Sequence, residues 1–240
     1  GKFFAVLAVY TIALLFSVTH VFVLWKIGNP DMGLMFTTYF GYWLAGASLL
    51  AAGMFASALT SSTTVAFVLG TVICAIPIFI GQIAPSSELI QSLSLVEQFQ
   101  DFSTGVIPLG AVLYFISLAV MMLYLNRILI TRRHWSAQQQ NSMGLQYLIR
   151  TVSLAVILIS ANVIVSYGSS RIDMTGEKVY SVSQTTRDLL SKIDEKNPIT
   201  IEAFISPEVS REYVPIRKRL IGLLREYNQL GGKRLQVRFV

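Results

Sequence analysis

Residues 36–59 read FTTYFGYWLAGASLLAAGMFASAL, a run without a single Asp, Glu, Lys or Arg side chain. A helix needs about 20 mostly apolar residues to cross the hydrocarbon core of a bilayer, and this run is long enough. Its small residues recur three or four positions apart, so that they share one helical face: Gly41, Ala45, Ser48, Ala52 and Ala56. Such a face lets helix backbones approach closely in lipid. The pattern predicts a packed membrane-spanning helix, and a lining for a transport path is the alternative interpretation of the same face.

Four further segments share this length and apolar character. They cover residues 3–24, 65–83, 108–125 and 147–167. The chain of 240 residues is 53% hydrophobic and only 13% charged, whereas soluble domains carry about 25% charged residues. The first segment is longer than the apolar core of a cleavable signal peptide. The sequence therefore predicts an α-helical polytopic membrane protein with about five transmembrane helices.

Basic residues mark the connection between the fourth and fifth predicted spans. The connection, residues 127–146, contains no acidic residue. Lys and Arg accumulate in short cytoplasmic loops, so we expect this basic linker in the cytoplasm and the C-terminal tail on the other side of the membrane. The residues that determine this topology are Arg127, Arg132, Arg133 and, just inside the fifth span, Arg150.

The connection between the third and fourth spans has a different pattern. Over residues 87–101, apolar residues recur at helical spacing with polar residues between them. The segment is too short and too polar to span, so it predicts an amphipathic helix at the outer membrane surface. Its apolar positions are Leu89, Leu93, Val96 and Phe99. Two interpretations stay open, an outer gate and an inert interfacial connector.

The C-terminal tail has the composition of a water-soluble domain. Residues 171–240 carry thirteen of the nineteen Lys and Arg residues and nine of the thirteen Asp and Glu residues. Periodicity predicts helices over 182–193 and 215–230, and strands over 199–205 and 235–240. A strand, a helix and a strand of these lengths favour parallel pairing of the strands. Residues 168–240 thus predict the start of a soluble α/β domain.

Side chains with catalytic or ligand-binding chemistry are scarce. The sequence contains no phosphate loop of the form G-x-x-x-x-G-K-[ST], and one cysteine with two histidines gives no zinc-binding set. His20 and Ser48 could serve intramembrane serine proteolysis, but they lie at different predicted depths. No span carries Asp, Glu or Lys at its centre, which disfavours an ion-coupled carrier. We predict that the chain is not an enzyme and binds no cofactor, metal or nucleic acid.

Several stretches resemble the permease subunits of ABC-2 type transporters, especially those associated with gliding motility. They are residues 41–44, 53–60 and 65–67 within the spans and residues 97–105 outside the membrane, where the family often has a His in place of Gln98. The tail, with Lys178-Val179-Tyr180-Ser181-Val182-Ser183, is similar to the start of the auxiliary subunit of that group. That subunit has one N-terminal span and a periplasmic domain.

The resemblance implies a permease fused to its auxiliary subunit. Residues 1–126 would be the last four spans of a six-helix permease, 147–167 the transmembrane helix of the auxiliary part, and 168–240 an incomplete periplasmic domain. It further implies a separate ATPase that uses the ATP, a pair of permease copies, a periplasmic partner, and export across the bacterial inner membrane. The main ATPase contact would precede Gly1, which leaves residues 60–64 as a secondary candidate. The alternative is a membrane anchor that presents a periplasmic interaction domain without transport.

Overall fold

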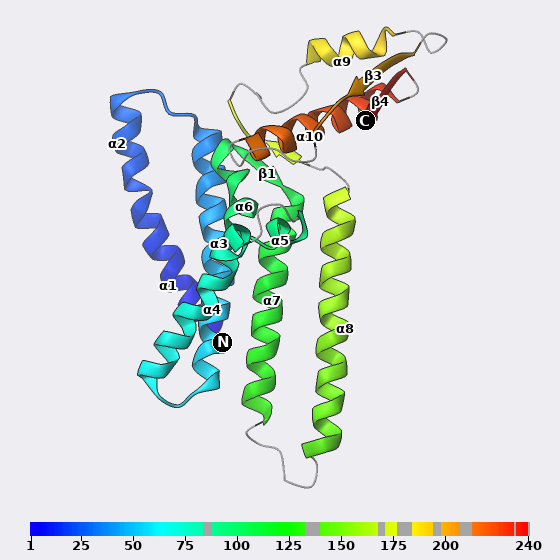
Figure 1. The fold of residues 1–240 in the computed structure, drawn as a ribbon. Coiled ribbons are helices and arrows are strands. Elements are labelled where there is room, and N and C mark those ends of the chain that lie inside the picture. Colours follow the sequence, from blue (N-terminus) through cyan, green and yellow to red (C-terminus); the bar gives the residue numbers. More distant parts are fainter. Residues whose placement is uncertain are drawn as a thin grey trace. The chain divides into compact units, whose positions relative to one another are not determined.

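The computed structural model describes residues 1–83, 88–132, 140–167, 171–176, 184–193, 198–206, 213–232 and 234–239. The chain divides into two compact units, Gly1–Met174 and Thr175–Val240. The first unit is built from long helices, and the second contains a small sheet with helices (Figure 1). Each unit is described by itself below.

Within the described residues, five helical segments are long and apolar enough to cross a membrane. Their number agrees with the number of spans that the sequence predicts. The segments are α1 (Lys2–Ser17) with α2 (Thr19–Ile27), α3 (Met32–Leu59), α4 (Thr63–Ile83), α7 (Leu109–Arg132) and α8 (Gln140–Tyr167).

The ends of α3 follow from the residues that flank it. The Asp31 side chain accepts hydrogen bonds from the backbone N–H groups of Gly33 (2.8 Å) and Leu34 (3.2 Å). A capping carboxylate of this kind satisfies backbone donors that have no partner inside the helix. The helix therefore begins at Met32, four residues before the predicted span, and it ends at the predicted Leu59.

The outer connection is not the single helix that the sequence predicts. The residues described there form α5 (Glu88–Ser92), α6 (Leu95–Gln100), the 3-10 turn η1 (Phe102–Thr104) and the strand β1 (Val106–Pro108). The helical spacing is interrupted because Ser94 adopts an extended conformation and is buried. A Cβ atom built at Gly81 of α4 would lie 2.8 Å from the Ser94 hydroxyl oxygen, so the break is packed closely on α4.

A short strand after the fifth helix joins this outer connection. Strand β2 (Arg171–Asp173) pairs antiparallel with β1, with Ile172 opposite Ile107. The Met174 N–H also donates to the Gly105 carbonyl oxygen at 3.0 Å, and Gly105 has the φ of +92° that favours glycine. Because of this pairing the first unit continues to Met174, beyond the boundary predicted at residue 168.

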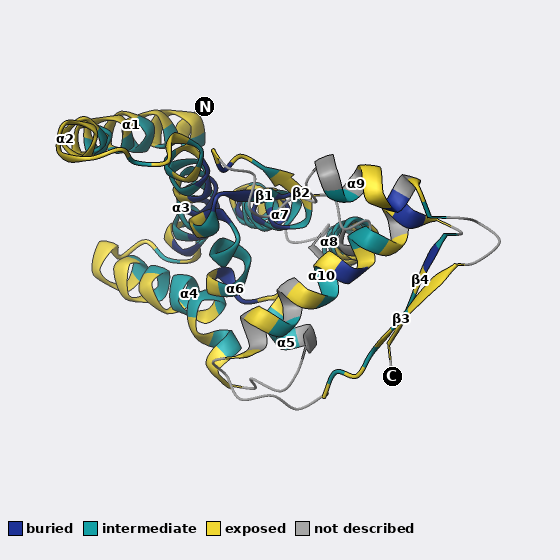
Figure 2. Ribbon diagram, turned by 90° about the horizontal axis from the view of Figure 1, so that it is seen from above, coloured by how far each residue is buried: buried dark blue, intermediate teal, exposed yellow. Residues whose placement is uncertain are grey.

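Helix α3 is the centre of the first unit. It packs most extensively against α7, then α4, and also contacts η1 and α1. The buried residues gather on α3 and on the segment from α6 to β1 (Figure 2). The core of the unit consists of Leu44, Ala45, Leu95, Phe102, Ala111 and Phe115.

The second unit contains the predicted strand–helix–strand arrangement. Its described elements are α9 (Gln184–Ser191), β3 (Ile199–Ala203), α10 (Val214–Gly231) and β4 (Leu235–Phe239). Strands β3 and β4 are parallel, with Ile199 opposite Leu235, which confirms the predicted pairing. Leu190, Leu224 and Leu235 are buried. Residues 182 and 183 of the predicted helix and the terminal Val240 lie outside the described residues.

Candidate functional site

The small-residue face of α3 is buried along its whole length. Gly41, Ala45, Ser48, Ala52 and Ala56 are all buried, on the helix that packs against α7 and α4. The Ser48 hydroxyl donates to the Ala45 carbonyl oxygen at 2.7 Å, so its polarity is satisfied within its own helix. In this conformation the face is filled by helix packing. A transport path along it would require α3 and α7 to separate, and that role stays a prediction.

The outer end of this face is covered by Phe102, whose side chain is fully buried. A Cβ atom at Gly41 would lie 2.8 Å from Phe102 Cβ and Cγ, so only glycine fits at this contact. One turn earlier, the hydroxyl of Thr37 lies 2.9 Å from the Phe102 carbonyl oxygen, to which it can donate. Thr37 is itself fully buried. The outer segment is therefore attached to α3 by both a close packing contact and a buried hydrogen bond.

An aromatic cluster surrounds Phe102. Its ring centroid lies 6.1 Å from that of Phe40 on α3, 6.4 Å from that of Phe99 on α6 and 6.1 Å from that of Phe115 on α7. Tyr42 stacks on Phe99 at 4.9 Å. Aromatic pairs in this distance range contribute about 0.5–1.5 kcal/mol each beyond their buried area. The cluster therefore holds α3, α6 and α7 together at one end of the helix bundle.

Of the residues proposed as an outer gate, the three whose side chains are described do not share one environment. Leu93 and Val96 are each 52% exposed, whereas Phe99 packs against the core, and the side chain of Leu89 lies outside the description. The buried apolar residue of this segment is instead Leu95. The break at Ser94 rotates α6 relative to α5, so a single helical periodicity could not identify Leu95.

Two polar contacts fix the outer segment. The Gln98 side-chain amide donates to the Ser92 carbonyl oxygen at 2.7 Å and so ties α6 to the end of α5. The Tyr114 hydroxyl of α7 donates to the Leu93 carbonyl oxygen at 2.6 Å. Both contacts satisfy backbone oxygens at the break between the short helices, so Gln98 has a local structural role.

Helix α1 meets α3 through polar side chains. The Tyr10 hydroxyl donates to the Tyr42 carbonyl oxygen at 2.7 Å, and the Trp43 indole N–H donates to the Thr11 hydroxyl at 3.0 Å. Further along, the Tyr39 hydroxyl donates to the Ser17 carbonyl oxygen at 2.9 Å, next to the break between α1 and α2. At the same break His20 Nδ1 lies 2.9 Å from the Ser17 carbonyl oxygen, in keeping with a hydrogen-bonding role for His20.

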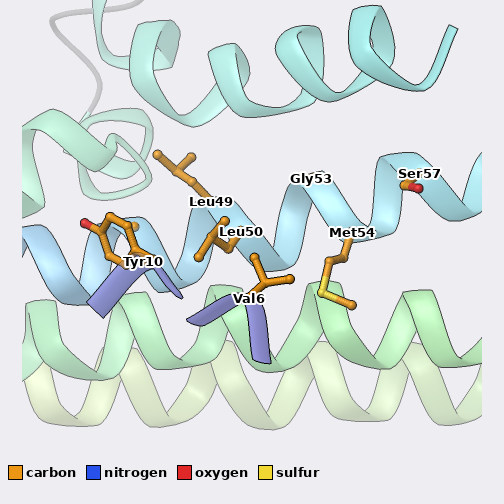
Figure 3. Close-up of a pocket in the computed structure, with 8 residues that line it drawn as sticks. Val6, Tyr10, Leu49, Leu50, Gly53, Met54 and Ser57 are labelled. Carbon is orange, nitrogen blue, oxygen red and sulfur yellow. The ribbon is translucent and has the colours of Figure 1, made fainter. Parts of the chain in front are cut away.

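A groove of about 440 Å³ lies between α1 and α3 (Figure 3). Tyr10 lies at one end and Ser57 at the other, with Val6 between them. The residues that line it are Val6, Tyr10, Gly46, Leu49, Leu50, Gly53, Met54 and Ser57.

The fourth and fifth helices are joined by a hydrogen bond within the apolar region. The Asn162 side-chain amide lies 2.8 Å from the Ser117 hydroxyl of α7 and 2.8 Å from the Leu158 carbonyl oxygen, and it can donate to both. An asparagine within an apolar helix commonly bonds to a neighbouring helix, and Asn162 does so here. Helix α8 thus packs directly on α7.

Three of the four arginines that are predicted to determine the topology, Arg127, Arg132 and Arg150, lie on helices. Arg127 and Arg132 are exposed on the last turns of α7, and Arg150 is exposed on α8, with its guanidinium carbon 5.7 Å from the Tyr147 ring centroid. Helices extend into both ends of the predicted linker, and residues 133–139, with Arg133, lie outside the described residues. Helices α7 and α8 run side by side with these ends together (Figure 1).

Among the described residues, no group of three or more His, Cys, Asp or Glu side chains could hold a metal ion.

The features that organise the site were only partly visible in the sequence. Thr37 and Phe102 were missed, although Thr37 lies one turn before Gly41 and continues the small-residue face.

Comparison with known families gives a match to the C-terminal part of the chain. Residues 176–240 match a family described as a domain of unknown function (DUF7088), and this range corresponds closely to the second unit. No curated protein matches the chain, and no solved structure matches it.

Proposed function

We propose that this chain is the membrane-spanning permease and auxiliary component of an ABC-2 type transporter, which exports a substrate with the help of a separate ATPase. In this proposal the protein lies in the bacterial inner membrane with its C-terminal domain in the periplasm. The observation that carries the proposal is that α8 and β2, which we assign to the auxiliary part, pack against the helix and the strand that we assign to the permease. The fifth helix bonds to α7 through Asn162, and β2 pairs with β1 beside the aromatic cluster.

In this proposal, these contacts transmit movement between the C-terminal domain and the interior of the helix bundle. Strand β1 lies between η1, which contains Phe102, and the start of α7. Phe102 in turn contacts the glycine at the outer end of the small-residue face. In a pair of permease copies, movements driven by the ATPase would separate α3 from α7 and open a path along that face, while the exterior domain contacts a periplasmic partner.

Co-purification tests the proposal against its alternative, a non-transporting anchor. The full chain carrying an affinity tag is extracted from its native membrane in mild detergent. Transport predicts a stoichiometric ATPase whose hydrolysis rate changes when this chain is present. A stable complex with periplasmic proteins alone, without an ATPase, would instead favour the anchor.

The predicted orientation is tested separately by labelling with a membrane-impermeant thiol reagent. The starting variant is Cys74→Ser, and single cysteines are then introduced at Gln138, between α7 and α8, and at Arg225, which is exposed on α10. In intact spheroplasts we expect labelling at position 225 only, with position 138 labelled after lysis. Labelling of position 138 in intact spheroplasts would contradict the proposed orientation.

A further inference from the structure

The groove between α1 and α3 has the form of a site for one hydrocarbon chain. We propose that it binds an acyl chain of an anionic phospholipid, with the lipid phosphate beside Lys2. This inference rests on the membrane insertion in the proposed function, but not on transport, the ATPase or the substrate.

The two ends of the groove differ. At one end the Tyr10 ring packs over Gly46, where a Cβ atom would collide with it, and the Tyr10 hydroxyl is held by the Tyr42 carbonyl oxygen. This end is therefore blocked by a fixed aromatic ring. Toward the other end a Cβ atom at Gly53 would meet nothing within 4 Å, and the hydroxyl of Ser57 lies beyond it. The groove is thus apolar and closed at one end, and open with a polar group at the other.

The length of the groove matches one leaflet of a bilayer. Gly46 and Ser57, which mark its extent on α3, are separated along the helix by roughly 16 Å at about 1.5 Å per residue. The hydrocarbon core of a bilayer is about 30 Å thick, so one leaflet contributes about 15 Å. An acyl chain that enters beside Ser57 would end near Tyr10.

The width of the groove suits a single hydrocarbon chain. Dividing the volume of about 440 Å³ by the length of roughly 16 Å gives a mean cross-section of roughly 27 Å². One flexible chain fills a space of this width along its whole length, whereas a helix would enter it only with side chains.

Lys2 supplies the charge that selects the headgroup. It precedes Val6 by four residues, and Val6 precedes Tyr10 by four, so the three lie on one face of α1. Lys2 is exposed and carries the only formal side-chain charge on α1 and α3. Lys2 directly precedes the apolar residues of the first span, and a lysine beside such a span extends its ammonium group to the polar interface, where it attracts anionic lipids. The charged group of Lys2, the open end and the apolar groove therefore follow one another in the same order as the phosphate, the glycerol and the acyl chain of a phospholipid.

Native mass spectrometry of the full chain tests the proposal. The protein is expressed in cells, extracted in mild detergent and analysed for retained lipid. We expect about one tightly retained phospholipid per chain, several-fold richer in anionic species than the membrane. Gly53→Leu fills the groove from a position with free space and should lower retention at least fivefold. Gly110→Leu is the matched control, because a Cβ atom at Gly110 also meets nothing within 4 Å and Gly110 lies outside the groove.

A second variant separates the headgroup from the acyl chain. Lys2→Gln should keep the bound lipid but lose the preference for anionic species, so that the retained lipid has the composition of the membrane. Equal thermal unfolding of Gly53→Leu and Gly110→Leu would show that lost lipid does not reflect misfolding. The proposal is overturned if Gly53→Leu retains as much lipid as the wild-type protein, or if the lipid retained by the wild-type protein has the composition of the membrane. It is also overturned if Gly53→Leu loses a protein partner but keeps its lipid. None of these outcomes bears on whether an ATPase co-purifies.

Discussion

Helices α3 and α7 form the interior of the first unit, whereas the first span, α4 and α8 lie around them. The most apolar 18-residue windows of α3 and α7 have mean hydropathies of 1.4 and 1.9, and 33% and 22% of those windows are buried. The corresponding windows of the other three spans have higher mean hydropathies, 2.2, 2.3 and 2.2, and contain no buried residue. The most apolar helices are therefore the least buried.

This order is the reverse of that in a soluble protein, and the bilayer explains it. Lipid tails are as apolar as leucine, so there is no hydrophobic gain in burying an apolar helix against another one. Association depends on close packing and hydrogen bonds, which require small and polar residues. Glycine, alanine, serine and threonine lower the hydropathy of α3 and also make it the helix around which the others pack.

The comparison predicts that the loss of a large side chain lowers the free energy of unfolding according to how deeply that side chain is buried, and not according to the hydropathy of its helix. Phe102→Ala removes a fully buried ring from the aromatic cluster, and large-to-small core substitutions of this kind cost about 3–5 kcal/mol. Phe67→Ala on α4 removes a ring that is 76% exposed, and exposed sites usually stay within about 0.5 kcal/mol. The measurement is reversible unfolding in mixed detergent micelles. Equal losses for the two variants would break the comparison.

Replacing a glycine at a close contact by a larger residue should destabilise the protein more than the same replacement of a glycine in open space. Gly41→Leu forces side-chain atoms into Phe102, and overpacking costs about 1–3 kcal/mol. The control, Gly110→Leu, introduces the same side chain on α7 where a Cβ atom has no neighbour within 4 Å. The same unfolding assay reports both free energies. The idea of a tightly packed outer end fails if Gly41→Leu is as stable as the control.

A hydroxyl that joins two segments should contribute more than one that bonds within its own helix. The Thr37 hydroxyl lies 2.9 Å from the Phe102 carbonyl oxygen and also 2.9 Å from the Leu34 carbonyl oxygen of its own helix, so its one proton is shared between them. Thr37→Val removes this buried hydroxyl while keeping the shape of the side chain, at a cost of about 1 kcal/mol. Thr71→Val removes a hydroxyl that bonds to the Phe67 carbonyl oxygen of its own helix, and it should be nearly neutral. Hydrogen exchange at Gly105 and Val106 gives a local readout, which should rise only in Thr37→Val.

The smallest expected effect concerns the hydrogen bond between α7 and α8. Polar contacts between membrane helices average about 0.6 kcal/mol in double-mutant cycles. A cycle of Asn162→Ala, Ser117→Ala and the double variant should give a coupling energy of that size. Zero coupling would mean that the 2.8 Å contact does not hold α8 against α7.

The helices could be predicted because each span is recorded locally in its own residues. The length and apolar character of 36–59 predict α3 without knowledge of its neighbours, and the alternation in 199–205 predicts β3 in the same way. Even the pairing of β3 with β4 followed from the lengths of consecutive elements. The bilayer thickness and the helical rise set these features, and both are independent of tertiary structure.

The outer segment could not be predicted because tertiary contacts decide it. Ser94 interrupts the helix where it packs against Gly81, which lies thirteen positions earlier in the chain. The three residues of β2 form a strand only because β1 offers a partner. The groove depends on Tyr10 and Gly53, which belong to different helices and share no pattern. Spacing within one segment cannot report any of these contacts.

The pairing of β1 with β2 has a mechanical consequence. Only three residue pairs join the two strands, and β1 passes without a gap into the first residue of α7, Leu109. Tension applied to the chain from Thr175 onward would load these backbone hydrogen bonds before it reached α8. Below the force that breaks these hydrogen bonds, the strand pair would transmit a pull to the first turn of α7. Above that force the strands would separate, and the second unit would then be connected to α8 through the chain alone.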